Sequence, residues 1–500
     1  MLQCPLTNEK EKLMKNVLVL SGLFFGMLCI VPNGSQAQWQ PDVRLTNDSA
    51  YSYTSFNNAR CIATNGNAVH VVWTDFRDGN YEIYYKRSMN AGISWGPDTR
   101  LTNNTAYSEY PSVSVSGSVV HVVWEDTRDG NSEIYYKRST DGGSSWEDDT
   151  RLTNDPLESK LPSVSASGSI VHVVWNDYRD VNYEIYYKCS TDGGASWGAD
   201  TRLTNNTAYS EYPSISVAGS AVHVVWNDFR DGSDQIYYKR STDGGASWGP
   251  DIRLTNDSVS SQYPSVSVSG PVVYVVWTDW RDGNYEIYYK CSTDGGASWG
   301  TDTRLTNNPF TSLFPSVSVS GLFVHVVWID SRDGNDQLYY ACSTDGGASW
   351  GADTRLTDNM YFSESPSVSV SGSVVHVVWN DSRDGNTEIY YKRDSTGTVA
   401  GIKTVDVELP KEFSLSQNYP NPFNPTTKIR FGIPNDGTLH ATSLRVYDVL
   451  GREVATLLNE ATKPGTYERT FDGTGLASGV YLCKLQVGDF TQAKKLLLIK

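Results

Sequence analysis

Cysteine is scarce in this chain, with seven among 500 residues. Two cysteines lie in an N-terminal leader, and five are scattered over the rest, at Cys61, Cys189, Cys291, Cys342 and Cys483. An odd number of widely separated cysteines argues against a disulfide framework and against a zinc site. We therefore expect free thiols at strand edges and no bound metal.

Positive charge is also in deficit. The 41 Lys and Arg residues stand against 57 Asp and Glu residues, which gives a formal net charge of −16. An acidic surface repels the phosphate groups of nucleic acid. We therefore expect no nucleic-acid partner for this chain.

Long apolar runs are lacking beyond the leader. The run at 17–31 follows three lysines and precedes a small-residue stretch that ends at Ala37. It is too short to span a bilayer comfortably, and its layout is that of a secretory signal peptide. We predict a signal peptide over residues 1–37 and no transmembrane span in the mature chain.

What the chain has in abundance is a repeated unit. A tryptophan recurs at steps of 51 residues, at Trp73, Trp124, Trp175, Trp226, Trp277, Trp328 and Trp379. A fixed period near this length is the signature of a repeat architecture. Aromatic residues make up 12% of the chain and 42 residues are Gly, which is typical of short strands joined by tight turns.

The unit that begins at Arg202 predicts four strands. PSISVAG alternates small and apolar residues, and AVHVVWND is a run typical of a strand covered on both faces. A hairpin turn at RDGS leads to QIYYKRS, and a second tight turn at TDGGASW leads to DIRLT. Four antiparallel strands repeated around an axis describe a β-propeller blade.

The number of units follows from two patterns. WxDxRD occurs seven times, and so does RLT, at Arg44, Arg100, Arg151, Arg202, Arg253, Arg304 and Arg355. The first RLT precedes any complete unit and the last unit has none, so residues 43–46 should supply its outer strand. Such closure leaves no unpaired strand edge. We predict an all-β, monomeric protein with a seven-bladed β-propeller of four-stranded antiparallel blades over residues 41–395, closed by an N-terminal strand.

The second turn of the unit resembles the Asp-box, or BNR repeat, SxDxGxxW of sialidase-like propellers. Five full matches place the paired Asp and Trp at Asp141, Trp146, Asp192, Trp197, Asp243, Trp248, Asp294, Trp299, Asp345 and Trp350. The Asp can accept backbone N–H bonds, the Gly supplies a positive φ, and the Trp can bury its ring over the turn. The resemblance implies a structural motif, opposite any active site, on a scaffold that hosts many functions.

A catalytic site is not expected. A sialidase would need an Arg triad, a Tyr/Glu pair and an Asp acid, whereas every repeat here carries the same RLT. Catalysis needs unlike groups that converge on one point, and near-identical repeats supply identical groups that point in different directions. We predict no catalytic residues and no cofactor. A sialidase-type glycoside hydrolase is the alternative, and a structural or adhesin-like surface protein is a third interpretation.

Two recurrent polar groups have structural interpretations. Asp75, Arg77 and Asp78, like their equivalents, are expected to pair locally and hold the first hairpin of the unit. Histidines recur in the second strand, at His70, His121, His172, His223, His325 and His376. Equivalent positions on different blades lie too far apart to bind one metal at bonds of about 2 Å. We expect packing histidines.

Positions that differ between repeats are the candidates for ligand binding. Aromatic residues follow the WxD pattern or lie in the loops between units, at Phe76, Tyr178, Phe229, Trp280, Tyr110, Tyr212 and Tyr263. Both sets should lie towards the same face. Aromatic rings offer an apolar surface on which a sugar ring can stack. We predict that these residues form a carbohydrate-binding rim. A protein is the alternative ligand, and the alternative to any binding role is that these rings fill gaps between blades.

The composition changes after Arg393. Residues 396–410 are typical of a linker, and residues 411–500 predict a small β-sandwich. NYPNPFNPTT, YDVLGREV, GVYLCKL and KKLLLIK resemble the type A C-terminal sorting domain of the type IX secretion system. The resemblance implies the type IX machinery as a partner. It also implies a secreted protein, or one on the outer-membrane surface of a Gram-negative bacterium.

Overall fold

The computed structural model describes residues 39–56, 60–395, 412–434, 440–462, 465–488 and 490–499. The predicted signal peptide, residues 1–37, and the predicted linker, residues 396–410, lie outside the described residues. The chain divides into two compact units, Met1–Gly401 and Ile402–Lys500. Within the described ranges the regular structure is all β, and no helix has the length and apolarity that a membrane crossing needs.

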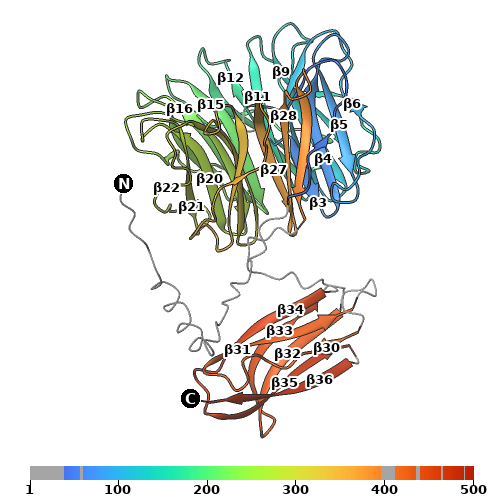
Figure 1. Ribbon diagram of the computed structural model, residues 1–500, viewed down its shortest axis with the longest axis vertical. Helices are drawn as coiled ribbons and strands as arrows, with labels where there is room; N and C mark the ends of the chain where they lie inside the picture. The colour runs from blue at the N-terminus through green and yellow to red at the C-terminus, as the bar shows by residue number, and fades with distance from the viewer. Residues whose placement is uncertain are drawn as a thin grey trace, which may run out of the picture. The chain divides into compact units, whose positions relative to one another are not determined.

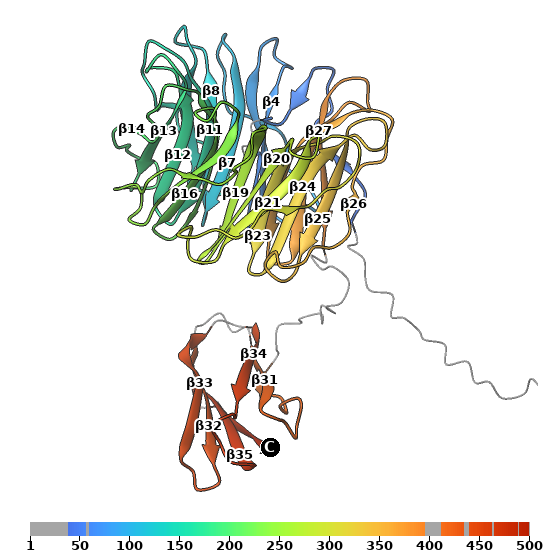
Figure 2. The same cartoon turned by 90° about the vertical axis from the view of Figure 1, so that its left-hand side faces the viewer.

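The described part of the first unit forms seven antiparallel sheets that stand side by side (Figures 1 and 2). Each sheet takes its strands in sequence order except the last, which adds β1 (Val43–Arg44) beside β29 (Glu388–Asp394). The second strand of each sheet carries the Val-His-Val-Val-Trp run or its variant. Every residue of that strand after the first is buried, as a strand covered on both faces requires. The predicted repetition of four-stranded antiparallel sheets is confirmed.

The strand positions recur with nearly constant bounds. First strands are β2 (Ser52–Tyr53) with β3 (Ile62–Asn65), β7 (Ser108–Ser116), β11 (Ser159–Ser167), β15 (Ser210–Ala218), β19 (Ser261–Ser269), β23 (Ser312–Ser320) and β27 (Ser363–Ser371). Second strands are β4 (Ala68–Asp75), β8 (Val119–Asp126), β12 (Ile170–Asp177), β16 (Ala221–Asp228), β20 (Val272–Asp279), β24 (Phe323–Asp330) and β28 (Val374–Asp381). Third strands are β5 (Glu82–Ser88), β9 (Glu133–Ser139), β13 (Glu184–Ser190), β17 (Gln235–Ser241), β21 (Glu286–Ser292), β25 (Gln337–Ser343) and β29 (Glu388–Asp394). Fourth strands are β6 (Thr99–Arg100), β10 (Thr150–Arg151), β14 (Thr201–Arg202), β18 (Ile252–Arg253), β22 (Thr303–Arg304), β26 (Thr354–Arg355) and β1 (Val43–Arg44).

Strand β1 pairs with β29, the third strand of the last sheet, with Val43 opposite Tyr391. The backbone N–H of Leu45 donates to the carbonyl oxygen of Ile389 at 2.8 Å. First strands of the first and last sheets also meet, where the hydroxyls of Thr64 and Ser369 lie 2.9 Å apart. The N-terminal segment therefore belongs to the same sheet as the last repeat.

Neighbouring sheets share their apolar faces. Between the third and fourth sheets, Val174 and Tyr187 pack in one cluster with Val224 and Trp226. The seven repeat tryptophans are fully buried in equivalent clusters. Side-chain hydroxyls add polar links, since the backbone N–H of Val266 donates to Ser214 Oγ of the preceding sheet at 3.3 Å.

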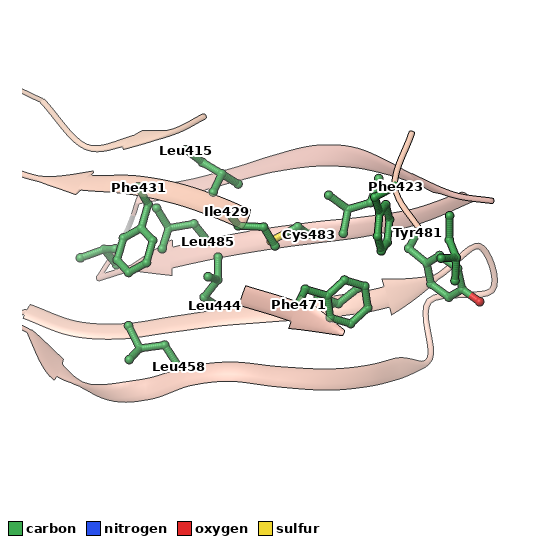
Figure 3. Packing of buried hydrophobic residues seen from close by; sticks show 14 of the residues in the cluster. Leu415, Phe423, Ile429, Phe431, Leu444, Leu458, Phe471, Tyr481, Cys483 and Leu485 are labelled. Carbon is green, nitrogen blue, oxygen red and sulfur yellow. The ribbon is translucent and has the colours of Figure 1, made fainter. Parts of the chain in front are cut away.

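The second unit consists of two antiparallel sheets around one core. One contains β30 (Ser414–Leu415), β31 (Thr426–Ile433) and β34 (Gly465–Asp472). The other contains β32 (His440–Asp448), β33 (Glu453–Thr462), β35 (Gly479–Val487) and β36 (Phe490–Leu498). Phe431 and Phe471 of the first sheet face Leu444 and Leu485 of the second (Figure 3). Alternate residues of β31 and of β35 are buried in this core, and the two sheets form the two layers of the unit.

Candidate ligand-binding face

The repeated Asp and Arg form a closed local network, as the fourth sheet illustrates. Asp228, fully buried at the end of β16, accepts hydrogen bonds from Trp226 Nε1 at 2.8 Å and Ser210 Oγ at 2.9 Å. Arg230 donates to both carboxylate oxygens of Asp228, at 2.7 and 2.6 Å, and lies 4.4 Å from the ring centre of Tyr237. The local pairing predicted for this hairpin is confirmed. Both carboxylate oxygens of Asp228 already accept hydrogen bonds from within the repeat.

We predict that Asp228→Ala lowers the free energy of unfolding by about 3–5 kcal/mol, because it leaves a guanidinium and an indole N–H without their buried acceptor. The control is Asp358→Ala, because Asp358 pairs with Arg355 while its side chain is 88% exposed. Surface ion pairs contribute little, so the control should melt like the parent chain. Thermal unfolding followed by circular dichroism compares the two; equal melting temperatures for both variants would contradict the account.

The Asp-box turns are built into the sheets. Asp243 Oδ1 accepts the backbone N–H of Ser247 at 2.9 Å. Gly245 has φ +90°, and a Cβ there would lie 1.8 Å from Tyr187 Oη of the preceding sheet. Trp248 packs edge-on against the same tyrosine, with ring centres 4.9 Å apart. This turn therefore packs against the preceding sheet through Tyr187.

The histidines are packing residues. His223 Nδ1 lies 2.7 Å from Tyr238 Oη, and the two rings stack within the sheet. Burial lowers the pKa of His223 to about 4, so the ring is neutral at physiological pH. Among the described residues, no group of three or more His, Cys, Asp or Glu side chains is arranged to hold a metal ion. The five cysteines of the described ranges form no disulfide with one another.

The hairpins between second and third strands and the loops that enter the first strands share one face, which we call the hairpin face. In the first sheet, Asn80 Nδ2 of the hairpin donates to the carbonyl oxygens of Asn104 and Ala106 in the following loop, at 3.0 and 2.7 Å. Equivalent bonds recur in other sheets. The two sets of candidate aromatic residues therefore lie on elements of this face.

The first candidate set lies on the hairpins, each in a different sheet. Phe76 packs edge-on against Tyr81 at 4.9 Å between ring centres, and Trp280 packs likewise against Tyr285 at 4.5 Å. Tyr178 contacts Tyr183 in the same way, also at 4.9 Å. Trp280 is 40% exposed and Phe229 is 46% exposed, so these rings keep a free surface.

The second candidate set lies where the first strands begin. Tyr110, Tyr212 and Tyr263 have positive φ values of 53–55°, at a bulge that recurs in the first strands. Tyr212 and Tyr263 are in edge contact at 5.2 Å between ring centres. Non-glycine residues in this conformation are uncommon, and each precedes a proline. Tyr212 and Tyr263 thus form a pair of rings from the fourth sheet to the fifth, whereas Tyr110 lies in the second sheet and contacts Phe56.

A pocket of about 380 Å³ opens between the first and last sheets. Its aromatic lining is Tyr51, Tyr53, Phe56 and Tyr81, and its polar lining includes Glu364 and Asn380. Tyr53 and Tyr81 meet edge-on at 5.5 Å between ring centres. The predicted residues Phe76 and Tyr110 border this pocket through Tyr81 and Phe56 respectively. The other five predicted residues lie in other sheets.

Carboxylates near this part of the face are partly desolvated. Burial raises the pKa of Glu364 and of Glu109, whose Oε1 accepts a 3.2 Å hydrogen bond from Tyr53 Oη. Glu125 stands opposite Glu109 in the strand register, and burial raises its pKa to about 7. Glu125 replaces the Asn or Thr of most other repeats, so this cluster breaks the repeat symmetry.

One irregularity in the spacing of the repeats points to the loop that lines the pocket. The RLT patterns at Arg44 and Arg100 are 56 residues apart, whereas later ones are 51 apart. The five additional residues fall in the loop that contains Tyr51, Tyr53 and Phe56. This departure from the period marks the loop that lines the pocket.

Comparisons with known proteins agree with two parts of this description. Residues 417–500 match a family described as secretion system C-terminal sorting domain. A sialidase from Clostridium perfringens is 23% identical over 211 residues, covering 34% of this chain and 55% of that protein. The chain thus spans about half the length of the curated relative that it matches.

Two solved structures are similar at low identity. A polysaccharide lyase, Uly1, is 9% identical with a TM-score of 0.48, covering 71% of this chain and 99% of that one. The endosialidase of phage phi92 is 9% identical with a TM-score of 0.45, covering 91% and 87%. The match over 417–500 confirms the predicted C-terminal domain and the predicted destination. The chain therefore ends in a secretion system C-terminal sorting domain, and the protein is exported by the type IX secretion system to the cell surface or extracellular space.

Proposed function

We propose that the first unit is a closed seven-bladed propeller that binds carbohydrate on its hairpin face, without catalysis, after export of the chain. In this proposal residues 1–37 are the signal peptide, 41–395 the propeller, 396–410 the linker and 411–500 the sorting domain. The observation that carries the proposal is the pocket lined by Tyr51, Tyr53, Phe56 and Tyr81.

The chemistry of this pocket suits a sugar. Aromatic rings stack on the apolar face of a pyranose, while carboxylate and amide groups accept and donate hydrogen bonds to its hydroxyls. The pocket combines four aromatic residues with Glu364 and Asn380 within about 380 Å³, which is the range of small-ligand sites. Tyr51 is 57% exposed, so a longer glycan could extend over it.

The pocket is also preorganised. Thr54 Oγ1 donates to the carbonyl oxygen of Ser365 at 2.7 Å and lies 2.9 Å from Asn380 Oδ1, which ties the first loop to the last sheet. Tyr53 is held by Glu109 and by Tyr81. Rings fixed in place lose little entropy when a ligand binds.

We predict that Tyr81→Ala lowers the affinity for the bound glycan at least about tenfold, because central aromatic contacts dominate such sites. Tyr285→Ala is the matched control, since Tyr285 holds the same hairpin position in the fifth sheet and packs on Trp280. A glycan array screened with the parent chain identifies the ligand, and titration calorimetry compares the variants. Equal losses of affinity for the two variants would overturn the assignment of the pocket. A loss of affinity for Tyr285→Ala alone would place the site at the hairpin of the fifth sheet.

A glycoside hydrolase is the second candidate, favoured by one observation. Glu125 is buried with a pKa raised to about 7, and a carboxyl group of that kind can act as a general acid. The curated relative is named a sialidase. Turnover of a fluorogenic sialoside or of a mixed polysaccharide panel, lost in Glu125→Gln, would establish this alternative and refute the non-catalytic proposal.

A further inference from the structure

One residue of the first sheet has no counterpart in the other repeats. Arg60 precedes the first strand β3 at the place where the other sheets carry a proline, at Pro111, Pro162, Pro213, Pro264, Pro315 and Pro366. Its side chain reaches Ser216 Oγ at 3.3 Å and the carbonyl oxygen of Val266 at 2.9 Å. These acceptors belong to the fourth and fifth sheets, so the side chain crosses the space between the first strands.

That space is a cavity of about 210 Å³ lined by the first strands of all seven sheets. Six sheets each present a serine to it, at Ser114, Ser165, Ser216, Ser267, Ser318 and Ser369. The first sheet presents Ala63 at the equivalent position. The lining is therefore rich in hydroxyl groups, and Arg60 is the ionisable side chain among the residues described there.

The guanidinium of Arg60 has no carboxylate partner among the described residues, whereas Arg77 and Arg230 each pair with two or more. Both hydrogen bonds of Arg60 use Nη2, which leaves Nε–H and Nη1 of its five N–H donors directed to no protein acceptor within the described ranges. Burial lowers the pKa of Arg60 to about 10, so the group stays charged at neutral pH.

An enclosed cation without a counter-ion is costly, and proteins compensate such a charge with an anion or with ordered water. We infer that the central cavity holds a small monovalent anion on the free donors of Arg60 and the serine hydroxyls beside it. At about 210 Å³ the cavity has room for a halide or a small carboxylate together with ordered water, since one water occupies about 30 Å³. The site is separate from the pocket on the hairpin face.

Crystals of the full chain soaked in sodium bromide test the inference directly, because bromide scatters anomalously. We expect one anomalous peak within hydrogen-bonding distance of Arg60 Nη1 or Nε. A cavity that contains water alone both at saturating bromide and after a soak in sodium formate would overturn the inference.

A solution measurement separates this anion from general salt effects. Sodium bromide should raise the melting temperature of the full chain by at least about 2 °C over sodium HEPES at equal ionic strength, through binding linkage. Sodium formate serves as a second arm, and a response to formate alone identifies a carboxylate rather than a halide as the ligand. This rise in melting temperature should vanish in Arg60→Met. If Arg60→Met does not fold, Arg60→Lys, which keeps the charge, serves as the test variant. An equal response of the parent chain and both variants would contradict the assignment.

Discussion

Removal of residues 41–48 is expected to lower the stability of the first unit by about 5 kcal/mol or more. The deletion takes away β1, and with it two of the three side-chain donors to Glu388, a fully buried carboxylate that accepts hydrogen bonds from Arg44, Thr46 and Asn386. It also removes Asp42, which pairs with Arg383 at 2.7 Å, and buried Leu45. The last sheet would then end in an unpaired edge.

A rescue variant controls for unspecific damage by the deletion. Residues 344–357 contain the Asp-box turn and the RLT segment that follow a third strand in the preceding repeat. Appending them after Asp394 should supply the missing fourth strand in cis and restore most of the lost stability. Chemical denaturation measures the three chains. An unchanged transition after deletion would refute closure by the N-terminal strand, and failure of the rescue would show that residues 41–48 act in another way.

The second large effect is a loss of stability in mild acid. Burial lowers the pKa of His70, His121, His172, His223 and His325 to about 4, and that of His376 to about 3. In the unfolded chain these groups titrate near pH 6.5. Between these values the unfolded state binds more protons, so the free energy of unfolding falls as the pH falls from about 6.5 to about 4.

The repeat multiplies the effect. At pH 5 each histidine contributes a loss of about 2 kcal/mol, so six equivalent groups shift the stability far more than one perturbed group would. The one sheet without this histidine supplies the control variant. Tyr274 occupies this position in the fifth sheet and stacks on Tyr289 as the histidines stack on their tyrosines. His223→Tyr should therefore fold and reduce the slope of stability against pH by about one sixth of the histidine part.

Unfolding by denaturant at several pH values between 5 and 7 measures this slope. The buried acid Glu125 changes the stability in the opposite direction. Because its pKa is raised in the folded protein, its contribution to the free energy of unfolding is lost as the pH rises through about 7. Glu109 and Glu364, whose pKa values burial also raises, act in the same direction, and we expect the six histidines to outweigh these acids. A stability that stays level from pH 7 to pH 5 would show that the histidines are charged in the folded protein.

Much of the fold could be predicted from the sequence because the same strand and turn patterns occur in each repeat. The apolar run ending in Trp226, the hairpin at Arg230 and the turn at Asp243 recur with one period, so errors in one copy are corrected by the others. The same redundancy also explains why the repeated Asp, Arg and His residues are structural: their partners lie in the same or the adjacent repeat, as those of Asp228 do.

The pocket and the cavity could not be predicted in the same way, because both depend on contacts between repeats that are far apart in the sequence. Tyr53 and Glu364 line one pocket although more than 300 residues separate them. Arg60 reaches Val266 across the first strands. Such distances carry no periodic signal. The 56-residue spacing of the first two RLT patterns shows that the first loop is different, but not which sheet it meets.

The most direct test of the carbohydrate-binding proposal is a crystal structure of the full chain soaked with the oligosaccharide that a glycan array selects. The account predicts a sugar ring stacked against Tyr53 or Tyr81, with hydrogen bonds to Glu364 or Asn380. A glycan bound on the opposite side, against the Asp-box turns around Asp243 and Trp248, would contradict it, as would a ligand seated only on the C-terminal unit.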